Sequence, residues 1–455
     1  MRLRITGIFF SVQAAIFTLC FVVAHAQEPR IPDIFLGGVP QEEKTTGVLK
    51  LSLADAIRNG LSHNLGAITG EQSVEAARAV RLATLSRLRP QVSAWAGTDY
   101  FPLRERDQDP TNAINAGISV TQTILDFSSR YRNSAAEENF KAVGYTNENA
   151  REMTAYVVSM LYLQTVADKS RIEAVRAQVR TASSLYDLAV DQKAAGVVSG
   201  IEILRAQVEL QSEQQRLIVA DDQFAKNKLT LARAIGLPPG QEFDLSEDMP
   251  FVPFAVMPLE KYIDQALRTR SDYLGAEAKV RVAELERKAA EAGNFPVLNV
   301  TADYRLRNQV QWDGHGSQVA IGADLNVPIF TGGAVKSRVM EADAALNRLK
   351  AEFEDIKAGI DYDVRKAFLD LKASDDRVRV AESAVLLAKQ QVVQSESRFR
   401  AGVTNNVEVV QAQEALATAN ENHIAGLRAH NMAKLSLARA AGIPGSEYES
   451  FLKGK

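Results

Sequence analysis

Two copies of one unit make up most of this sequence, and this duplication constrains the fold more than any other feature. The stretch KLTLARAIGLPPG begins at Lys228, and the similar stretch KLSLARAAGIPGS begins at Lys434, 206 residues later. The same offset aligns other positions: Leu53 with Leu259, Pro90 with Pro296, Gly196 with Gly402, and Glu202 with Glu408. A register kept over this length predicts a tandem duplication of a unit of roughly 190 residues.

The duplication also predicts where the segments of the chain begin and end. We place the first repeat at residues 51–239 and the second at 258–445, and a Pro-rich linker joins them at 240–257. An N-terminal extension covers residues 27–50, and a short C-terminal tail covers 446–455.

Residues 1–26 are typical of a cleavable signal peptide. Arg2 and Arg4 supply positive charge, a largely apolar stretch follows, and Ala24-His25-Ala26 has the A-x-A pattern of a cleavage site. A membrane anchor is the alternative, but polar residues interrupt the apolar stretch and the small-residue site follows at once. We therefore expect the mature, exported chain to begin at Gln27.

The only cysteine, Cys20, lies inside this signal. A lipoprotein signal would place a small residue before the cysteine, where this chain has Leu19. A mature chain without a thiol forms no disulfide, no cysteine-based metal site and no cysteine nucleophile. No later stretch of the sequence is apolar enough for a transmembrane helix.

Each repeat begins with a predicted helix, at about 52–88 and about 259–294, that stops before Pro90 or Pro296. A second, much longer helix follows later in each repeat. Its apolar residues recur with the a/d spacing of a coiled coil: Ile172, Val179 and Tyr186 in the first repeat, and Val378, Val385, Val392 and Phe399 in the second. These helices are predicted at about 130–194 and about 335–400.

Each long helix ends in a tight turn that contains Gly196 or Gly402, since glycine adopts the positive φ that ends a helix. A returning helix follows, at about 201–235 and about 407–441. The opening and returning helices together match one long helix in length. We therefore expect them to stack end to end beside it, in a rod roughly 100 Å long.

Two strands of about ten residues are predicted between the opening helix and the long helix, at about 91–101 and 114–123, and at about 297–307 and 318–328. Ten residues is about the length that a tilted strand needs to cross a bilayer. A half-buried hairpin of a soluble domain has the same pattern. The export signal, and the lack of another sheet for the hairpins to join, favour membrane strands.

The strand pattern gives the predicted sheet one apolar face and one polar face. Leu298, Val300, Ala302 and Tyr304 alternate with four polar residues that we take as candidates to line a lumen: Asn299, Thr301, Asp303 and Arg305. The strand around Val92–Phe101 alternates poorly, and we interpret its Trp95 and Tyr100 as aromatic residues at the membrane interface.

Four strands cannot close a barrel within one chain, and open sheet edges are costly in lipid. Several copies must therefore assemble. Two chains would give eight strands and an interior filled by side chains, whereas three chains would give twelve strands and a lumen. The helical rods would continue this barrel away from the membrane.

These segments together resemble the TolC-type outer-membrane efflux family, the outer membrane factors of tripartite efflux and type I secretion systems. The resemblance covers about Leu51 to Pro444 and rests on LSLADAIRNGLSHN, LRPQV, TQTILDFSSR, VPIFTGGAVKSR, AGVVSGIEILRAQ, RFRAGVTNNVEVVQAQ, LARAIGLPPG and LARAAGIPG. It implies a mainly α fold with β structure: a homotrimer with a twelve-stranded β-barrel, four strands per chain, continued by a long periplasmic α-helical barrel.

The resemblance also implies the function of an exit duct. The protein would pass small molecules or peptides from a periplasmic adaptor (a membrane fusion protein) and an inner-membrane pump across the outer membrane of a Gram-negative bacterium. It implies no cofactor, and the cargo stays open. A net charge of −3 argues against a nucleic-acid partner.

The family closes its periplasmic end at the helix tips, where an acidic residue six positions after the tip glycine matches Glu202 and Glu408. These glutamates either line the pore or interact with their own helix dipoles. In the family, a hydrogen-bonding Tyr near the tip helps to lock the periplasmic end closed, and this chain has Phe399 at that position. An ion pair between Glu202 and Arg398 or Arg400 is the substitute lock that we expect. The aperture candidates are Glu202, Arg398, Phe399, Arg400, Glu408 and Gln411.

The turns themselves match the family's adaptor-contacting tips, and glycine turn chemistry alone also explains them. The adaptor-contact candidates are Gly196, Val197, Ser199, Gly402, Val403 and Thr404.

Two other classes of protein were weighed. A periplasmic coiled-coil adaptor, or a structural coiled coil, would share the helices but lack the duplicated hairpins. An enzyme is disfavoured because the sequence has no Gly-rich phosphate loop, GxSxG or HExxH motif. His423 and His430 continue the apolar stripe of a returning helix, which favours helix packing over metal binding.

Overall fold

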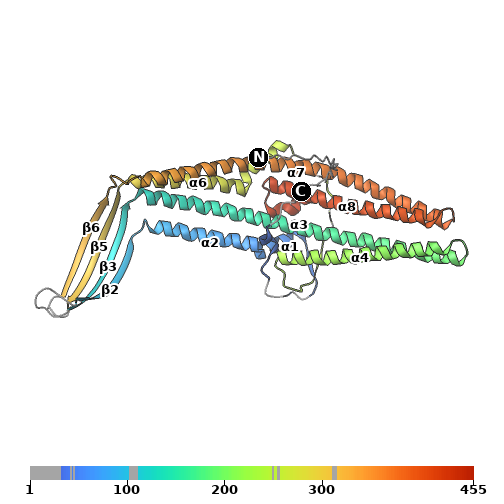
Figure 1. The fold of residues 1–455 in the computed structure, drawn as a ribbon, viewed down its shortest axis with the longest axis horizontal. Coiled ribbons are helices and arrows are strands. Elements are labelled where there is room, and N and C mark those ends of the chain that lie inside the picture. The colour runs from blue at the N-terminus through green and yellow to red at the C-terminus, as the bar shows by residue number, and fades with distance from the viewer. Residues whose placement is uncertain are drawn as a thin grey trace, which may run out of the picture.

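The computed structural model places the chain in two parts, a long helical rod and a sheet at one end of it (Figure 1). The described residues are 32–40, 44, 47–101, 111–247, 249, 251–253, 257–309 and 315–454. The predicted signal peptide, with Cys20 and the cleavage site after Ala26, lies outside them. Within the described ranges, no helix contains a segment both long and apolar enough to span a membrane.

The two repeats contain the same elements in the same order. The first has α1 (Leu53–His63), α2 (Leu65–Ser86), β2 (Gln91–Phe101), β3 (Thr111–Leu125), α3 (Phe127–Ala194) and α4 (Gly200–Ala234). The second has α5 (Leu259–Thr269), α6 (Ser271–Glu291), β5 (Val297–Gln309), β6 (His315–Asn326), α7 (Ala334–Arg400) and α8 (Asn406–Ala440). This order confirms the predicted class of duplicated helix–hairpin–long helix–helix units.

Each opening helix is broken in two, which corrects the single helices expected at 52–88 and 259–294. The first break is at Asn64 and the second at Arg270, 206 residues later, and both residues have extended backbones (ψ 136° and 122°). The Asn64 side chain accepts a hydrogen bond from the Gly66 amide at 2.9 Å and so caps α2.

The repeated motif that ends each returning helix explains where these breaks lie. Gly236 and Gly442 have φ of +67° and +71° and pack directly against the breaks. A Cβ on Gly236 would lie 2.4 Å from the Cβ of His63, and one on Gly442 would lie 2.4 Å from Oγ1 of Thr269. Each motif therefore ends a helix and also fits a glycine against the kink of its own repeat.

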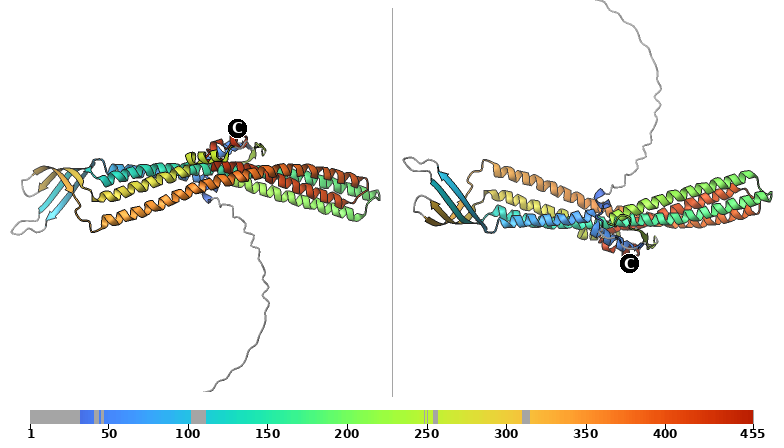
Figure 2. Two further views of the ribbon diagram at one scale, coloured as in Figure 1. Left: turned by 90° about the horizontal axis from the view of Figure 1, so that it is seen from above. Right: turned by 90° about the horizontal axis from the view of Figure 1, so that it is seen from below.

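The helices pack as predicted from their lengths. Helices α2 and α4 lie one after the other along α3, and α6 lies between α3 and α7, with α8 beside the far half of α7 (Figure 1). Views from above and below show the same arrangement (Figure 2). At 1.5 Å per residue, the 68 residues of α3 make a rod roughly 100 Å long.

The four long strands form one antiparallel sheet in the order β2-β3-β5-β6. The two hairpins therefore lie side by side, joined where β3 pairs with β5, and β2 and β6 are the outer strands. Paired residues point to the same face, so the register tests the two predicted faces. Ile118 pairs with Tyr304 and Tyr304 with Val319, whereas Ser119 pairs with Asp303, as expected.

The same register corrects the interpretation of Trp95. Trp95 pairs with Gly117, and Gly117 pairs with Arg305, which puts the indole on the polar face. Tyr100 has the opposite parity and lies on the apolar face with Val92 and Ile118. A position on the polar face contradicts the membrane-interface role expected for Trp95, whereas for Tyr100 that role stays a prediction.

A layer of small elements surrounds the middle of the rod, and the sequence did not predict it. It contains η1 (Asp33–Leu36), β1 (Leu49–Leu51), β4 (Phe243–Leu245), η3 (Gly445–Glu447) and α9 (Tyr448–Leu452). Strand β1 pairs in parallel with β4, so the N-terminal extension joins the linker between the repeats. Leu51, Tyr162, Leu231 and Tyr448 share one buried cluster beneath this layer.

The two duplicated lysines attach this layer to the rod. Nζ of Lys228 donates to the carbonyl of Phe243 at 2.6 Å. Nζ of Lys434, which is fully buried, donates to the carbonyls of Val252 at 2.6 Å and Leu452 at 3.1 Å. Together with the helix breaks, these bonds explain why the motif occurs twice.

Burial lowers the pKa of Lys434 to about 8 from its usual 10.5. Between these values the unfolded chain binds more protons than the folded chain, so stability rises with pH. We expect the free energy of unfolding to rise by up to about 1.4 kcal/mol per pH unit above pH 8. Above about pH 10 the raised pKa values of Tyr162 and Tyr448 act in the opposite direction. Chemical unfolding between pH 7.5 and 9.5 measures the slope.

The control for this slope is Lys434→Met, which should remove it, whereas Lys228→Met should leave it in place. An equal slope in the wild-type protein and Lys434→Met would rule out this source.

Candidate functional site

The tips of the two helical hairpins have the same backbone geometry. Gly196 and Gly402 have φ of +72° and +69°, in the left-handed region that glycine tolerates best. The amide after each glycine donates to the carbonyl five residues earlier, from Val197 to Gln192 at 2.8 Å and from Val403 to Arg398 at 3.0 Å. These bonds are those of a Schellman turn, so local sequence alone sets the tips.

A small apolar cluster holds the two tips together. Phe399 and Val409 of the second repeat pack with Leu185 of the first, and Phe399 is 1% exposed. Nε2 of Gln192 donates to the Phe399 carbonyl at 3.4 Å. The tip of the first repeat is therefore packed against the tip of the second within one chain.

The two duplicated glutamates have different partners. Glu202 is buried, accepts from Arg205 at 2.9 Å, and receives the backbone amide of Asn406 at 3.4 Å. Because Asn406 begins α8, the Glu202 carboxylate lies at the N-terminus of the other repeat's helix, where its charge is favourable. Glu408 instead pairs with Arg398 at 3.2 Å and accepts from Thr404 at 2.5 Å.

The ion pair expected between Glu202 and Arg398 or Arg400 as a substitute lock does not form within the chain. Arg398 pairs with Glu408, and Arg400 lies 3.9 Å from Glu396 on its own helix. Gln411 lies on α8 and lines a surface groove with Leu387 and Ala388 of α7. Of the aperture candidates, the structure therefore brings together Arg398 with Glu408, and Phe399 with the apolar cluster.

Replacing Phe399 by Tyr tests this geometry, because it adds a hydroxyl to a buried apolar cluster. An unpaired buried hydroxyl costs about 1–3 kcal/mol, so Phe399→Tyr should open the tips roughly tenfold more often. Trypsin cleavage at the tips under native conditions measures this opening. Phe399→Leu, which adds no polar atom, is the control. Slower cleavage of Phe399→Tyr than of the wild-type protein would contradict the prediction.

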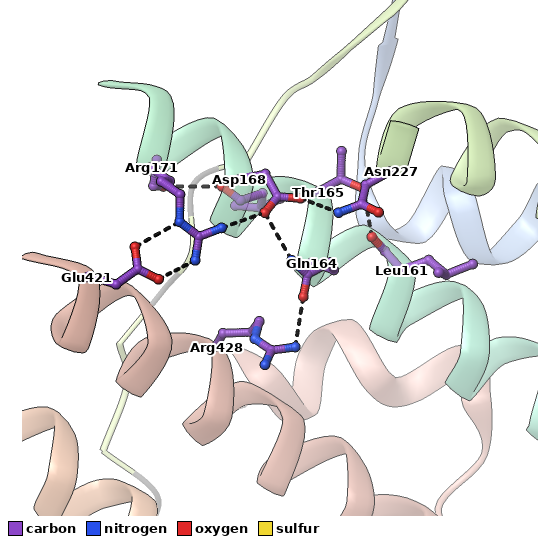
Figure 3. A network of polar contacts seen from close by, with 10 residues as sticks. Leu161, Gln164, Thr165, Asp168, Arg171, Asn227, Glu421 and Arg428 are labelled. Atoms are coloured by element: carbon purple, nitrogen blue, oxygen red, sulfur yellow. Dashed lines mark hydrogen bonds and ion pairs between the residues drawn. The ribbon is translucent and has the colours of Figure 1, made fainter. Parts of the chain in front are cut away.

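A network of charged and amide side chains connects α3 with α4 and α8, closer to the middle of the rod (Figure 3). At its centre, Asp168 of α3 is 1% exposed. Its carboxylate accepts from Gln164 at 3.0 Å, Arg171 at 3.0 Å and Asn227 of α4 at 2.5 Å. We call Gln164, Asp168, Arg171, Asn227, Glu421 and Arg428 the brace.

The brace reaches α8 through two arginine contacts. The guanidinium of Arg171 binds both carboxylate oxygens of Glu421, with Nε to Oε2 at 2.8 Å. Arg428 of α8 donates to Oε1 of Gln164 at 2.7 Å. The hydrogen bond to Glu421 raises the pKa of Arg171, so the guanidinium stays charged. The brace therefore fixes the first helical hairpin against the second at a distance from the tips.

No pattern in the sequence predicts the brace. The partners Arg171 and Glu421 lie 250 residues apart, and neither belongs to a recognisable motif.

Comparison with known proteins gives the chain its family. The sequence matches the family model described as outer membrane efflux protein over residues 63–237 and 262–443. The chain belongs to this family. One matched range lies in each of the two predicted repeats, so the family match follows the duplication of the chain.

Individual relatives agree with this assignment. Outer membrane protein TolC of Vibrio cholerae is 24% identical over 370 residues, which cover 78% of this chain and 83% of TolC. The pyoverdine export outer membrane protein OpmQ of Pseudomonas aeruginosa is 25% identical over 376 residues, or 79% of this chain and 76% of OpmQ. The crystal structure of VceC from Vibrio cholerae aligns with a TM-score of 0.75 at 18% identity, covering 86% of this chain and 96% of VceC.

In this outer membrane efflux protein, the predicted lumen residues share one face of the sheet. Asn299 accepts from Oγ1 of Thr123 at 2.9 Å, and Asp303 lies 3.9 Å from Arg305. Thr301 pairs with Thr121 in the register. The polar face therefore extends over both hairpins of the sheet.

His430, whose role the sequence left open, is fully buried and packs 5.2 Å from the Phe251 ring. The described residues contain no group of three or more potential metal-ligating side chains. This environment supports helix packing for His430.

Proposed function

We propose that this outer membrane efflux protein is the exit duct of a tripartite efflux or type I secretion system, and that it works as a homotrimer. The observation that carries the proposal is the open sheet. Its outer strands β2 and β6 each pair on one side only among the described residues, and its two faces differ in polarity. Three copies joined edge to edge would pair every strand and enclose the polar face.

The rod supports the same proposal. A helical tube that continues from the barrel would carry cargo across the periplasm, and the tips at its end would form the aperture. Glu202, Glu408 and Arg398 are the aperture residues that we propose, with Phe399 as the apolar contact beneath them. The tip residues Gly196, Val197, Ser199, Gly402, Val403 and Thr404 are the proposed adaptor contacts.

A groove beside the brace offers an adaptor a second surface. It measures about 920 Å³ and is lined by α3, α4 and α8, with Arg171, Arg216, Glu414 and Glu421 among its residues. A helical hairpin of a periplasmic adaptor would fit between the two helical pairs here. OpmQ is described as a pyoverdine export protein, and another relative, AprF of Pseudomonas aeruginosa, as an alkaline protease secretion protein, so the relatives do not narrow the cargo to one class.

Purified protein in a planar lipid bilayer tests the proposal directly. We expect discrete, reproducible conductance steps, and a trimer by native mass spectrometry in detergent. A monomer that stays soluble without detergent and never conducts would favour the periplasmic adaptor or structural coiled coil instead.

A further inference from the structure

One row across the polar face of the sheet combines an aromatic ring with an exposed positive charge. In the register, Trp95 of β2 pairs with Gly117 of β3, Gly117 with Arg305 of β5, and Arg305 with Gln318 of β6. Paired residues point to the same side, so all four lie on the polar face. Two strand spacings of about 4.8 Å separate the Trp95 backbone from that of Arg305.

The indole of Trp95 lies over Gly117. Cε2 and Cζ2 of the indole are 3.1 Å from the position that a Gly117 Cβ would occupy. Gly117 is buried in the sheet, while Trp95 itself stays 43% exposed. The ring therefore lies against the glycine and keeps part of its surface open.

Arg305 supplies a charge beside this ring. Its side chain is 58% exposed, and among the described residues its ion-pair partner is Asp303, whose carboxylate is 3.9 Å away, longer than a hydrogen bond. The Asp303 side chain is only 21% exposed. The other acids on this face among the described strand residues are farther along. Asp99 accepts a hydrogen bond from Asn115 at 2.7 Å, and Asp324 pairs with Asn299, four register pairs from the pair that Asp303 makes with Ala320.

We propose that Trp95 and Arg305 form a transit site for planar aromatic anions inside the barrel. The ring of the ligand stacks on the open surface of Trp95, and its carboxylate reaches the Arg305 guanidinium about two strands away. The site rests on the proposed function, because only the closed trimer makes this face a lumen. Three copies would then repeat the pair around the wall.

Block of single channels by 3,5-dinitrobenzoate tests the site. We expect reversible block of the wild-type protein, and a half-blocking concentration at least tenfold higher in both Trp95→Leu and Arg305→Gln, since aromatic stacking contributes a factor of this order. Cyclohexanecarboxylate has the same charge without an aromatic ring and should block weakly. Ser119→Ala, on the same face in the neighbouring row, is the control and should match the wild-type protein.

Fluorescence gives a second measurement that needs no conductance. The chain has two tryptophans, so Trp312→Phe leaves Trp95 as the only one. Dinitrobenzoate should quench Trp95 in the detergent-solubilised protein at least tenfold more tightly than it does in the Arg305→Gln form of that variant. Equal block in the wild-type protein and both variants, or equal quenching with and without Arg305, would overturn the site. Absence of any conductance would count against the proposed function, and quenching would still decide the site.

Discussion

Asp168→Ala is expected to lower the free energy of unfolding by about 3 kcal/mol and to raise the conductance of the channel. Removing one partner of a buried ionic group costs about 3–5 kcal/mol. The low end applies because Arg171 keeps its bonds to Glu421 after the change. The Asn227 amide, 2.5 Å from the carboxylate in the wild-type protein, loses its acceptor. Helix α4 is then held to α3 less firmly. Gln164 and Arg171, which bind α8, also lose the carboxylate that positions them, so the tips move apart more easily.

Two measurements check this prediction, thermal melting of the detergent-solubilised protein and single-channel conductance in planar bilayers. Glu421→Gln is the graded comparison, because the Arg171 and Glu421 side chains are 32% and 49% exposed. A pair this exposed is worth about 0–1 kcal/mol. Asp222→Asn, which breaks an exposed pair with Lys226 on α4 alone, should change neither quantity. If Asp168→Ala melts and conducts like Asp222→Asn, the brace does not hold the helices.

The parts of the fold that sequence could predict depend on local or periodic signals. The coiled-coil spacing through Val378 and Val392 marks α7, and both residues are buried. The alternation of apolar and polar residues marks β5 and β6 in a similar way, because each face of a sheet lies in one environment. The turns at Gly196 and Gly402 need only the local backbone.

The helix breaks could not be predicted in this way, because distant residues cause them. Asn64 in LSHNLGAITG is a local N-cap for α2, but its extended backbone is stabilised by residues far along the chain. The amide of Leu65 donates to the carbonyl of Gly37 at 3.0 Å, and the amide of Val39 donates to that of His63 at 2.8 Å. The N-terminal extension thus takes the hydrogen bonds that a continuous helix would make itself.

The candidate site also has one part that the sequence predicts and another part that it does not. The aperture residues came from a family resemblance, but their partners did not follow from it: Glu202 and Glu408 are equivalent in the repeat and yet bind different groups. By contrast, the face of the sheet on which Trp95 lies could have been predicted from the sequence. Val92, Ala94 and Ala96 alternate with it, and this parity already places Trp95 opposite the apolar set.

Asn64→Ala is expected to lower the free energy of unfolding by about 3 kcal/mol, as much as the loss of Asp168. Asn64 is fully buried, and its Nδ2 donates to the carbonyls of Phe35 at 2.7 Å and Ala234 at 2.9 Å. Loss of the α2 cap costs about 1 kcal/mol, and each carbonyl left without a partner adds about 1 kcal/mol or more. The shift in melting temperature of the detergent-solubilised protein measures the total.

Comparison with Ser52→Ala separates the cap from the buried bonds. Ser52 caps α1 through its Oγ, which accepts from the Asp55 amide at 3.1 Å, and within the described residues the hydroxyl donates to the nearby Asp55 carboxylate rather than to a distant carbonyl. Its loss should therefore cost about 1 kcal/mol, the value of a cap alone. Asn64→Asp keeps the cap but cannot donate to Phe35 or Ala234, so it should melt closer to Asn64→Ala than to Ser52→Ala. Equal melting of Asn64→Ala and Ser52→Ala would mean that the buried side-chain bonds from Asn64 to Phe35 and Ala234 contribute nothing to stability.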